Sequence, residues 1–262
     1  MSPEVTYGSY LKIPELLSLQ QVASDPPEHD ETLFIIIHQV YELWFKQVLH
    51  ELDHMVDHLD NDAPHRGGHQ LKRVLKILKI LVAQLDVLET MTPLEFDSFR
   101  HFLANASGFQ SVQFRELEFL LGMKDPAHVE RFAHNPTEHA RLLRRLEAPS
   151  AWDRFLAYLD RSGHPIPSYV LERDVSQPVT ASEEVQETLI NIYLNDPALA
   201  EFCESLTDLD EGLQEWRYRH VKMVQRTIGT KMGTGGSLGA AYLQTTLFKP
   251  AFPDLWDIRA RF

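Results

Sequence analysis

Among the side chains of this chain that could bind a metal, histidines outnumber cysteines, with 13 histidines and a single cysteine, Cys203. One cysteine excludes an internal disulfide, a cysteine zinc site, an iron–sulfur cluster and a Cys-x-x-Cys-His haem attachment. Any metal chemistry must therefore rest on histidine, on carboxylate or on a cofactor that is held without a covalent bond.

One histidine, His38, lies in an apolar and aromatic stretch of sequence. On helical spacing it shares a face with Phe34, Tyr41 and Phe45. Such a residue is either a core histidine whose ring nitrogens are satisfied internally or a functional histidine in a water-poor pocket. The pattern leaves both interpretations open.

A second histidine, His220, shares a helix face with Leu213, Trp216, Val224 and Thr227. An imidazole in an apolar slot suits the axial ligand of a haem iron, because the macrocycle needs apolar walls and the iron needs one neutral nitrogen. A core histidine is again the alternative, but two such histidines on separate long helices favour a functional role.

Three more histidines, His50, His54 and His58, recur every four residues farther along the first long helix. This spacing could form a metal-binding face. The neighbouring Asp53 and Asp57 are polar, so we expect a solvated stripe.

Two further features could bind an anion. Residues 231–239 hold four of the 12 glycines and could offer backbone N–H groups, although an ordinary interhelical loop is the alternative. The glycine spacing does not match a dinucleotide fingerprint, and a helix precedes it where a strand is required. Arg100, beside Phe96 and Phe99, is either a rim residue or a carboxylate clamp.

These residues are expected to lie mostly on helices, because glycine is sparse and apolar residues recur at three- and four-residue intervals. Thr92, Pro93 and Glu95 form a capping-box pattern. Helix starts are also indicated at Asp125, Asn135, Ser150 and Asp196. We expect one all-α domain with helices near 14–22, 30–60, 69–90, 93–103, 110–121, 126–134, 136–147, 150–161, 183–195, 197–206 and 209–229, and a last helix after the glycine-rich loop.

Composition narrows the class of protein. An apolar content of 44% over 262 residues excludes disorder, and a formal net charge of -13 argues against a nucleic-acid partner. No apolar run approaches the roughly 20 residues that cross a bilayer, and the first residues lack the features of a signal peptide. We therefore expect a soluble, cytoplasmic protein.

The N-terminus is unusually apolar for a chain end. Tyr7, Tyr10, Leu11 and Ile13 precede the first expected helix, and termini are normally loose unless something holds them. The segment either packs on its own core or docks onto another subunit.

Taken together, these residues resemble the tryptophan 2,3-dioxygenase family, whose members are haem enzymes that open the indole ring of L-tryptophan. The similarity covers nearly the whole chain in the family's order, and it is carried by residues 7–11, 29–39, 41–46, 88–92, 99–100, 107–111, 216–220 and 233–237.

The resemblance implies a single-domain multi-helix bundle that encloses haem b and assembles as a homotetramer. Residues 1–13 would form an arm that docks on a neighbouring subunit, and residues 14–262 the catalytic domain. L-tryptophan and O2 would react at ferrous iron to give N-formylkynurenine, the first step of tryptophan catabolism in the kynurenine pathway.

The resemblance also implies residue roles on the cofactor side of the site. His220 matches the proximal haem ligand, which leaves the sixth iron position open for O2. Trp216, Ser107 and Gly108 would lie beside the haem.

On the substrate side, His38 matches the distal histidine that hydrogen-bonds the indole N–H, and Arg100 matches the residue that pairs with the substrate carboxylate. Other matching residues line the pocket or belong to the arm that enters a neighbour's active site: Phe34, Phe96, Thr234, Tyr7, Tyr10 and Leu11.

The chain departs from the family pattern at Leu238, where the glycine-rich loop usually has serine. Phe96 also stands where some relatives have tyrosine, and an extra helical insertion of longer members is absent. A related branch inserts one oxygen into tryptophan or a methylated tryptophan to give a 2-oxindole. That reaction is one alternative to dioxygenation, and a non-catalytic haem and tryptophan sensor is another.

Overall fold

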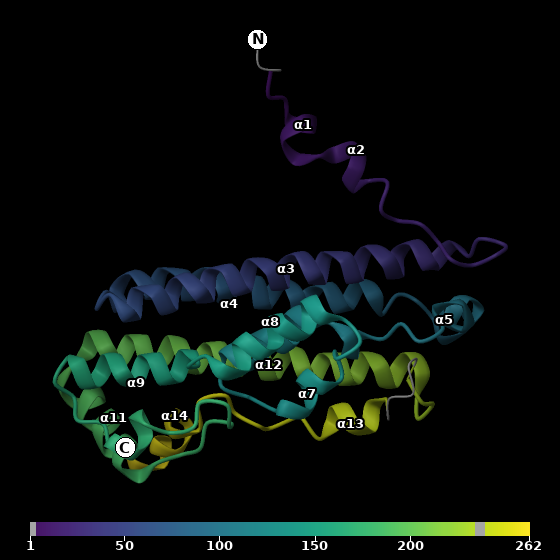
Figure 1. Ribbon diagram of the computed structural model, residues 1–262. Helices are drawn as coiled ribbons and strands as arrows, with labels where there is room; N and C mark the ends of the chain where they lie inside the picture. Colours follow the sequence, from purple (N-terminus) through teal and green to yellow (C-terminus); the bar gives the residue numbers. More distant parts are fainter. Residues whose placement is uncertain (1–3, 234–238) are drawn as a thin grey trace.

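The computed structural model describes residues 4–233 and 239–262, and these residues form helices without strands (Figure 1). The frame consists of three long helices, α3 (His29–Asp60), α4 (Pro64–Leu88) and α12 (Pro197–Ile228). A short turn reverses the chain between α3 and α4, and α4 packs between α3 and α12. The prediction of an all-α fold is confirmed.

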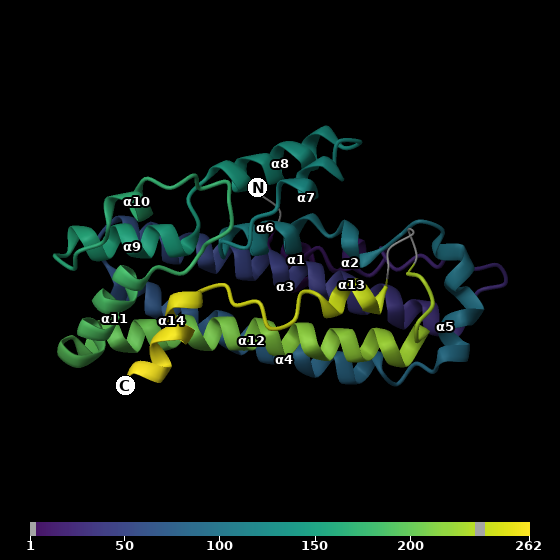
Figure 2. The same ribbon diagram turned by 90° about the horizontal axis from the view of Figure 1, so that it is seen from below.

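Shorter helices cover this frame. They are α5 (Pro93–Arg100), α6 (Val112–Leu120), α7 (Pro126–Glu130), α8 (Pro136–Glu147), α9 (Ala151–Arg161), α10 (Ser168–Leu171), α11 (Glu183–Asn195), α13 (Ala240–Gln244) and α14 (Pro253–Asp257). Turns of 3-10 helix span His101–Leu103, Gly108–Gln110 and Ile258–Arg261. Figure 2 shows α5 and α13 at the end of the bundle where α3 begins and α12 ends.

The predicted helix starts are confirmed by their caps. The Thr92 side chain accepts from Glu95 N while the Glu95 carboxylate accepts from Thr92 N at 2.7 Å, which closes the capping box before α5. Side chains of Asp125, Asn135, Ser150 and Asp196 accept backbone N–H groups at the starts of α7, α8, α9 and α12. Each cap satisfies donors that a helix cannot pair internally.

Two predicted boundaries are wrong. The helices expected at 197–206 and 209–229 are one continuous helix, α12, because Thr207 bonds within the helix to the carbonyl of Cys203. Asp210 accepts from the backbone of Ala251 and Phe252, so a polar segment that read as a break is satisfied from a distant part of the chain.

The helix expected at 14–22 is also wrong. Two short helices, α1 (Tyr7–Leu11) and α2 (Ile13–Leu16), precede a non-helical stretch up to Glu28. A capping box between Thr6 and Ser9 starts α1. Helix α4 begins at Pro64, five residues before the predicted 69, with proline at its first position.

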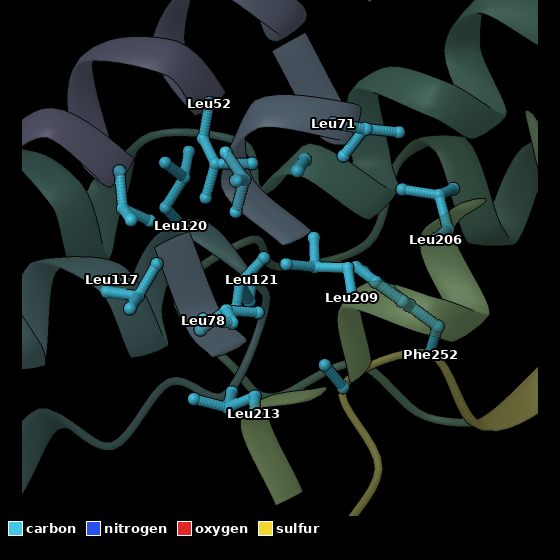
Figure 3. Packing of buried hydrophobic residues seen from close by; sticks show 14 of the residues in the cluster. Leu52, Leu71, Leu78, Leu117, Leu120, Leu121, Leu206, Leu209, Leu213 and Phe252 are labelled. Atoms are coloured by element: carbon cyan, nitrogen blue, oxygen red, sulfur yellow. The ribbon is translucent and has the colours of Figure 1, made fainter. Parts of the chain in front are cut away.

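The core lies where the three long helices meet α6, α9, α11 and α14. Figure 3 shows part of it, with labelled leucines from α3, α4, α6 and α12. Leu52, Leu71 and Leu78 from α3 and α4 pack with Leu209 of α12, and each is at most 3% exposed. A smaller cluster joins α6, α7 and α8 through Phe119, Val129, Phe132 and Leu142, among others. None of the helices in the described residues is both long and apolar enough to cross a membrane.

The N-terminal segment projects away from this body (Figure 1). Its root is tied to α3, because the Glu31 carboxylate accepts from the backbone of Ala23 and Ser24 at 2.7 and 3.0 Å. Beyond the root, Tyr7 is 77% exposed and Tyr10 is 75% exposed. Tyr7, Tyr10 and Leu11 therefore do not pack on the core of their own chain.

Candidate active site

A cavity of about 250 Å³ lies at the end of the bundle where α3 begins and α12 ends, and α5, α6 and α13 complete its walls. Most lining side chains are apolar or aromatic. Eight of the residues expected at the site line this one cavity: Phe34, His38, Phe96, Arg100, Ser107, Gly108, Trp216 and His220.

His38 presents a hydrogen-bond acceptor to the cavity. Its Nδ1 lies 2.7 Å from the carbonyl oxygen of Phe34. Because a carbonyl only accepts, Nδ1 carries the proton, and the neutral ring keeps a lone pair on Nε2. Burial lowers the pKa of His38 by more than the Phe34 hydrogen bond and the Glu42 carboxylate raise it. The ring is therefore neutral near pH 7.

Aromatic rings pack beside His38. The Phe34 ring lies 4.1 Å from the His38 ring, 5.7 Å from Phe96 and 5.6 Å from Phe99, measured between centroids. Phe96 and Phe99 meet edge to face at 5.4 Å. This wall suits a flat aromatic ligand and excludes water.

His220 faces the same cavity from α12. Its ring stacks on Trp216 with centroids 5.2 Å apart and planes 4° from parallel. Burial and then the neighbouring His38 lower the pKa of His220 to about 4, so the imidazole is neutral. The side chain keeps some exposure because it opens on the cavity. Its lone pair is thus available to a metal.

Trp216 is held by an aromatic cluster rather than by a hydrogen bond. Its ring lies 6.2 Å from Tyr41, 6.0 Å from Phe45 and 5.0 Å from Phe114. Its buried Nε1 has no hydrogen-bond partner among the described residues. Packing on several sides fixes the indole, and the stacked indole fixes the plane of His220.

Arg100 links the cavity to the segment that enters the glycine-rich loop. Its Nη2 donates to the carbonyl of Met232, and Asp97 on the same helix pairs with Lys231 at 3.2 Å. Arg100 is half-buried and lines the cavity. A guanidinium has five N–H donors, so the contact with Met232 leaves donors for a ligand carboxylate.

A buried charged group in the cavity wall was not predicted from the sequence. Glu118 Oε2 lies 2.5 Å from Arg115 Nη1, and Glu118 Oε1 lies 2.7 Å from Arg217 Nη2. All three residues are 6% exposed and line the cavity. Two guanidinium groups and one carboxylate leave one net positive charge, which favours an anionic ligand.

No sequence signal separated Arg115 and Glu118 from ordinary surface charges. They are three residues apart, which is common on solvated helix faces, and their partner Arg217 is 99 residues from Glu118. Arg217 could have been noticed, because it lies beside Trp216 in the segment that carries His220.

The three expected site residues of the N-terminal arm do not reach the cavity of their own chain. Tyr7, Tyr10 and Leu11 are exposed and do not line it. Thr234 and Leu238 lie outside the described residues.

The outer histidines form no metal centre in the part of the chain that the structure describes. His50 and His54 are exposed, as the predicted solvated stripe requires, while His58 is half-buried with its ring 4.3 Å from that of His54.

Comparison with known proteins gives one consistent family. The family model described as "Tryptophan 2,3-dioxygenase" matches residues 1–163 and 150–262. The chain is 59% identical over 260 residues to a protein of that name from Herpetosiphon aurantiacus, covering 99% of both chains. A protein of the same name from Anaeromyxobacter sp. (strain K) is 54% identical over 263 residues, covering 98% of this chain and 96% of its own length.

Proposed function

This chain belongs to the tryptophan 2,3-dioxygenase family, and from this premise we infer that the cavity is the site at which L-tryptophan reacts. The chain catalyses the dioxygenation of tryptophan by O2, which opens the indole ring to N-formylkynurenine. The observation that carries the assignment is full-length identity of 59% together with the convergence of His38, Arg100 and His220 on one cavity.

The family is haem-dependent, and the residues of the cavity fit haem b. A haem needs apolar walls, a neutral nitrogen for the iron and cations for its propionate carboxylates. The aromatic walls, the unprotonated His220 and the net positive charge on Arg115, Glu118 and Arg217 offer these three features. His220 would bind the haem iron through its unprotonated ring nitrogen.

Other residues would hold the macrocycle in place. Trp216 would keep the His220 ring in its plane, and Ser107 and Gly108 would lie at the haem edge. When bound, haem supplies the iron chemistry that activates O2. The protein's own contribution is positioning and electrostatics.

The substrate would be oriented at both ends. Arg100 would bind the carboxylate of L-tryptophan, and the Thr234 hydroxyl would assist from the loop. At the other end, the indole N–H would donate to Nε2 of His38, whose Nδ1 proton is committed to Phe34. Phe34 and Phe96 would hold the indole plane and exclude water. His38 tunes binding in this proposal and need not act as a base.

The exposed arm supports an assembly in which subunits share their sites. Residues 1–13 would dock on a neighbour, where Tyr7, Tyr10 and Leu11 would close its indole pocket, and residues 14–262 would form the catalytic domain. The support is that these side chains are exposed in the single chain. Leu43 and Ile80, exposed on α3 and α4, offer further apolar surface for a homotetramer.

An absorption spectrum of the ferrous chain before and after addition of L-tryptophan and O2 tests this function. We expect a histidine-ligated haem spectrum that changes on tryptophan binding, followed by the absorbance of N-formylkynurenine. A colourless chain, or a haem chain that binds tryptophan without turnover, would contradict the proposal.

A further inference from the structure

His128, on the short helix α7, is only 6% exposed. It lies behind the charged wall of the cavity, which is formed by Arg115, Glu118 and Arg217. Its Nε2 lies 3.5 Å from Nη1 of Arg115 and 3.8 Å from a carboxylate oxygen of Asp125. No sequence motif singles out this histidine, and the proposed reaction does not use it directly.

The contact with Arg115 determines which nitrogen of His128 carries the proton. A guanidinium has no acceptor, so Nε2 must present its lone pair and the neutral ring must be protonated on Nδ1. Nδ1 is buried and has no hydrogen-bond partner among the described residues. An unpaired buried donor is destabilising, so His128 Nδ1 does not explain the position of this ring. The ring instead provides an acceptor, Nε2, for Arg115.

With His128 Nε2 as acceptor, both hydrogens of Arg115 Nη1 have partners. Arg115 Nη1 has two hydrogens, and the acceptors Glu118 Oε2 and His128 Nε2 can take one each. Within the described residues, the other two nitrogens of the guanidinium, Nη2 and Nε, have no hydrogen-bond partner. Neither nitrogen is completely buried, so a ligand can still reach their N–H groups. These free N–H groups belong to a side chain that lines the cavity.

We propose that His128 is a positioning residue that holds Arg115 with its free N–H groups toward the carboxylates of the bound haem. This inference rests on the haem site proposed above. Glu118 neutralises charge in this cluster, whereas a neutral His128 supplies an acceptor without changing the charge.

Burial is the main reason that the His128 ring stays neutral. Burial and then Arg115 lower its pKa, Glu118 and Asp125 raise it, and Arg131 lowers it. The net effect is a pKa below the usual value of 6.5, so the lone pair on Nε2 is present at neutral pH.

The first test compares haem loss from His128→Leu and His128→Gln. The transfer of haem from each holoprotein to excess apomyoglobin is followed by absorbance. Leucine removes the acceptor, so we expect loss to be faster by about five-fold, the value of one hydrogen bond. Glutamine places a carboxamide oxygen near the position of Nε2 and should restore the wild-type rate. His134→Leu, an exposed histidine of the same region, is the matched control and should not change the rate.

A double-mutant cycle separates positioning from general damage. In an Arg115→Gln background, His128→Leu should not accelerate haem loss further, because its partner is gone. Equal acceleration in both backgrounds would overturn the proposal, as would failure of glutamine to restore the rate.

A haem-free readout distinguishes this proposal from the haem site itself. NMR titration of His128 in the full chain should show a higher pKa in Arg115→Gln, because a neighbouring positive charge is removed. If wild type binds haem but the pKa of His128 is the same in wild type and Arg115→Gln, the proposal for His128 is contradicted and the haem site is not. A wild-type chain that takes up no haem would contradict the proposed function.

Discussion

The bundle formed by α3, α4 and α12 is packed solid at one end and hollow at the other, where residues of all three helices line the cavity. At the solid end, Leu52 and Leu59 of α3 and Leu206 of α12 are at most 1% exposed. At the hollow end, His38 and His220 occupy equivalent apolar faces and remain half-buried. The same helical periodicity therefore closes a core in one region and lines a pocket in the other.

The two ends differ in whether their buried side chains still need hydrogen-bond or metal partners. Aliphatic side chains are satisfied by contact with one another, whereas the ring nitrogens of His38 and His220 need polar partners. The described residues supply only one of them, the Phe34 carbonyl for His38 Nδ1. The unmet requirements identify the hollow end as the place where ligands complete the structure.

The largest effect is expected at the hollow end from His220→Ala. Activity should fall to background and the purified chain should lose its histidine-ligated haem spectrum, because the proposed axial ligand is removed. Folding of the haem-free chain should change by less than about 1 kcal/mol, since the ring borders a cavity. Absorption spectra and circular dichroism check both points, and unchanged ligation would refute the assignment of His220.

The opposite behaviour is expected at the solid end from Leu52→Ala. This substitution leaves a hole where no ligand can enter, so the free energy of unfolding should fall by about 2–5 kcal/mol. Urea denaturation measures the loss. The KM for tryptophan of the folded fraction should not change, and a changed KM would show that the two ends are coupled.

Selectivity for the substrate carboxylate is expected to depend on Arg100. Wild-type protein should bind L-tryptophan better than tryptamine by about 2–3 kcal/mol, the value of a charge-assisted hydrogen-bond pair. Arg100→Ala should remove most of this difference, which calorimetric titration can measure. If discrimination persists in the variant, the carboxylate is recognised elsewhere.

Deletion of residues 1–12 tests whether the hollow end is completed by another subunit. The chain should remain helical, because the periodic apolar pattern begins with α3, but tryptophan affinity should fall about ten-fold through loss of apolar burial. Mixing the truncated chain with full-length His220→Ala should restore activity in mixed oligomers, since one chain brings the arm and the other the haem. Inactive mixed oligomers would show that the arm serves its own subunit.

The smallest effect is expected from His38→Ala, which removes one hydrogen bond to the indole N–H. Catalytic efficiency should fall about five- to ten-fold. The pKa of His38 is lowered from 6.5, so the ring is neutral above pH 6.5. Wild-type affinity for tryptophan should therefore stay constant above pH 6.5. It should decline only at lower pH, where the ring becomes protonated and Nε2 can no longer accept. Binding curves across this range check the sign, and a decline that begins at higher pH would contradict a neutral, accepting His38.

Helices and caps could be predicted from the sequence because their determinants are local. Thr92 with Glu95, and the polar residues before Pro126, Pro136 and Pro197, act within four residues of themselves. The apolar faces of His38 and His220 were likewise visible as helical spacing.

Two of the failures, the break placed within α12 and the unpredicted charged cluster, arise because polar residues are satisfied from far away in the chain. Asp210 accepts from Ala251, Phe252 and Trp256, so α12 continues through a segment that looked like a break. The pairing of Glu118 with Arg217 spans 99 residues and leaves no local signal. The charged wall of the cavity, and with it the role proposed for His128, became visible only in three dimensions.

The most direct test of the central claim, that the hollow end carries out tryptophan dioxygenation, is the mass of the product formed from L-tryptophan under isotopically labelled O2. We expect N-formylkynurenine with both labelled oxygen atoms, formed by the wild-type chain and not by His220→Ala. A product with a single labelled oxygen, as in a 2-oxindole, or no product from the haem-loaded chain, would contradict it.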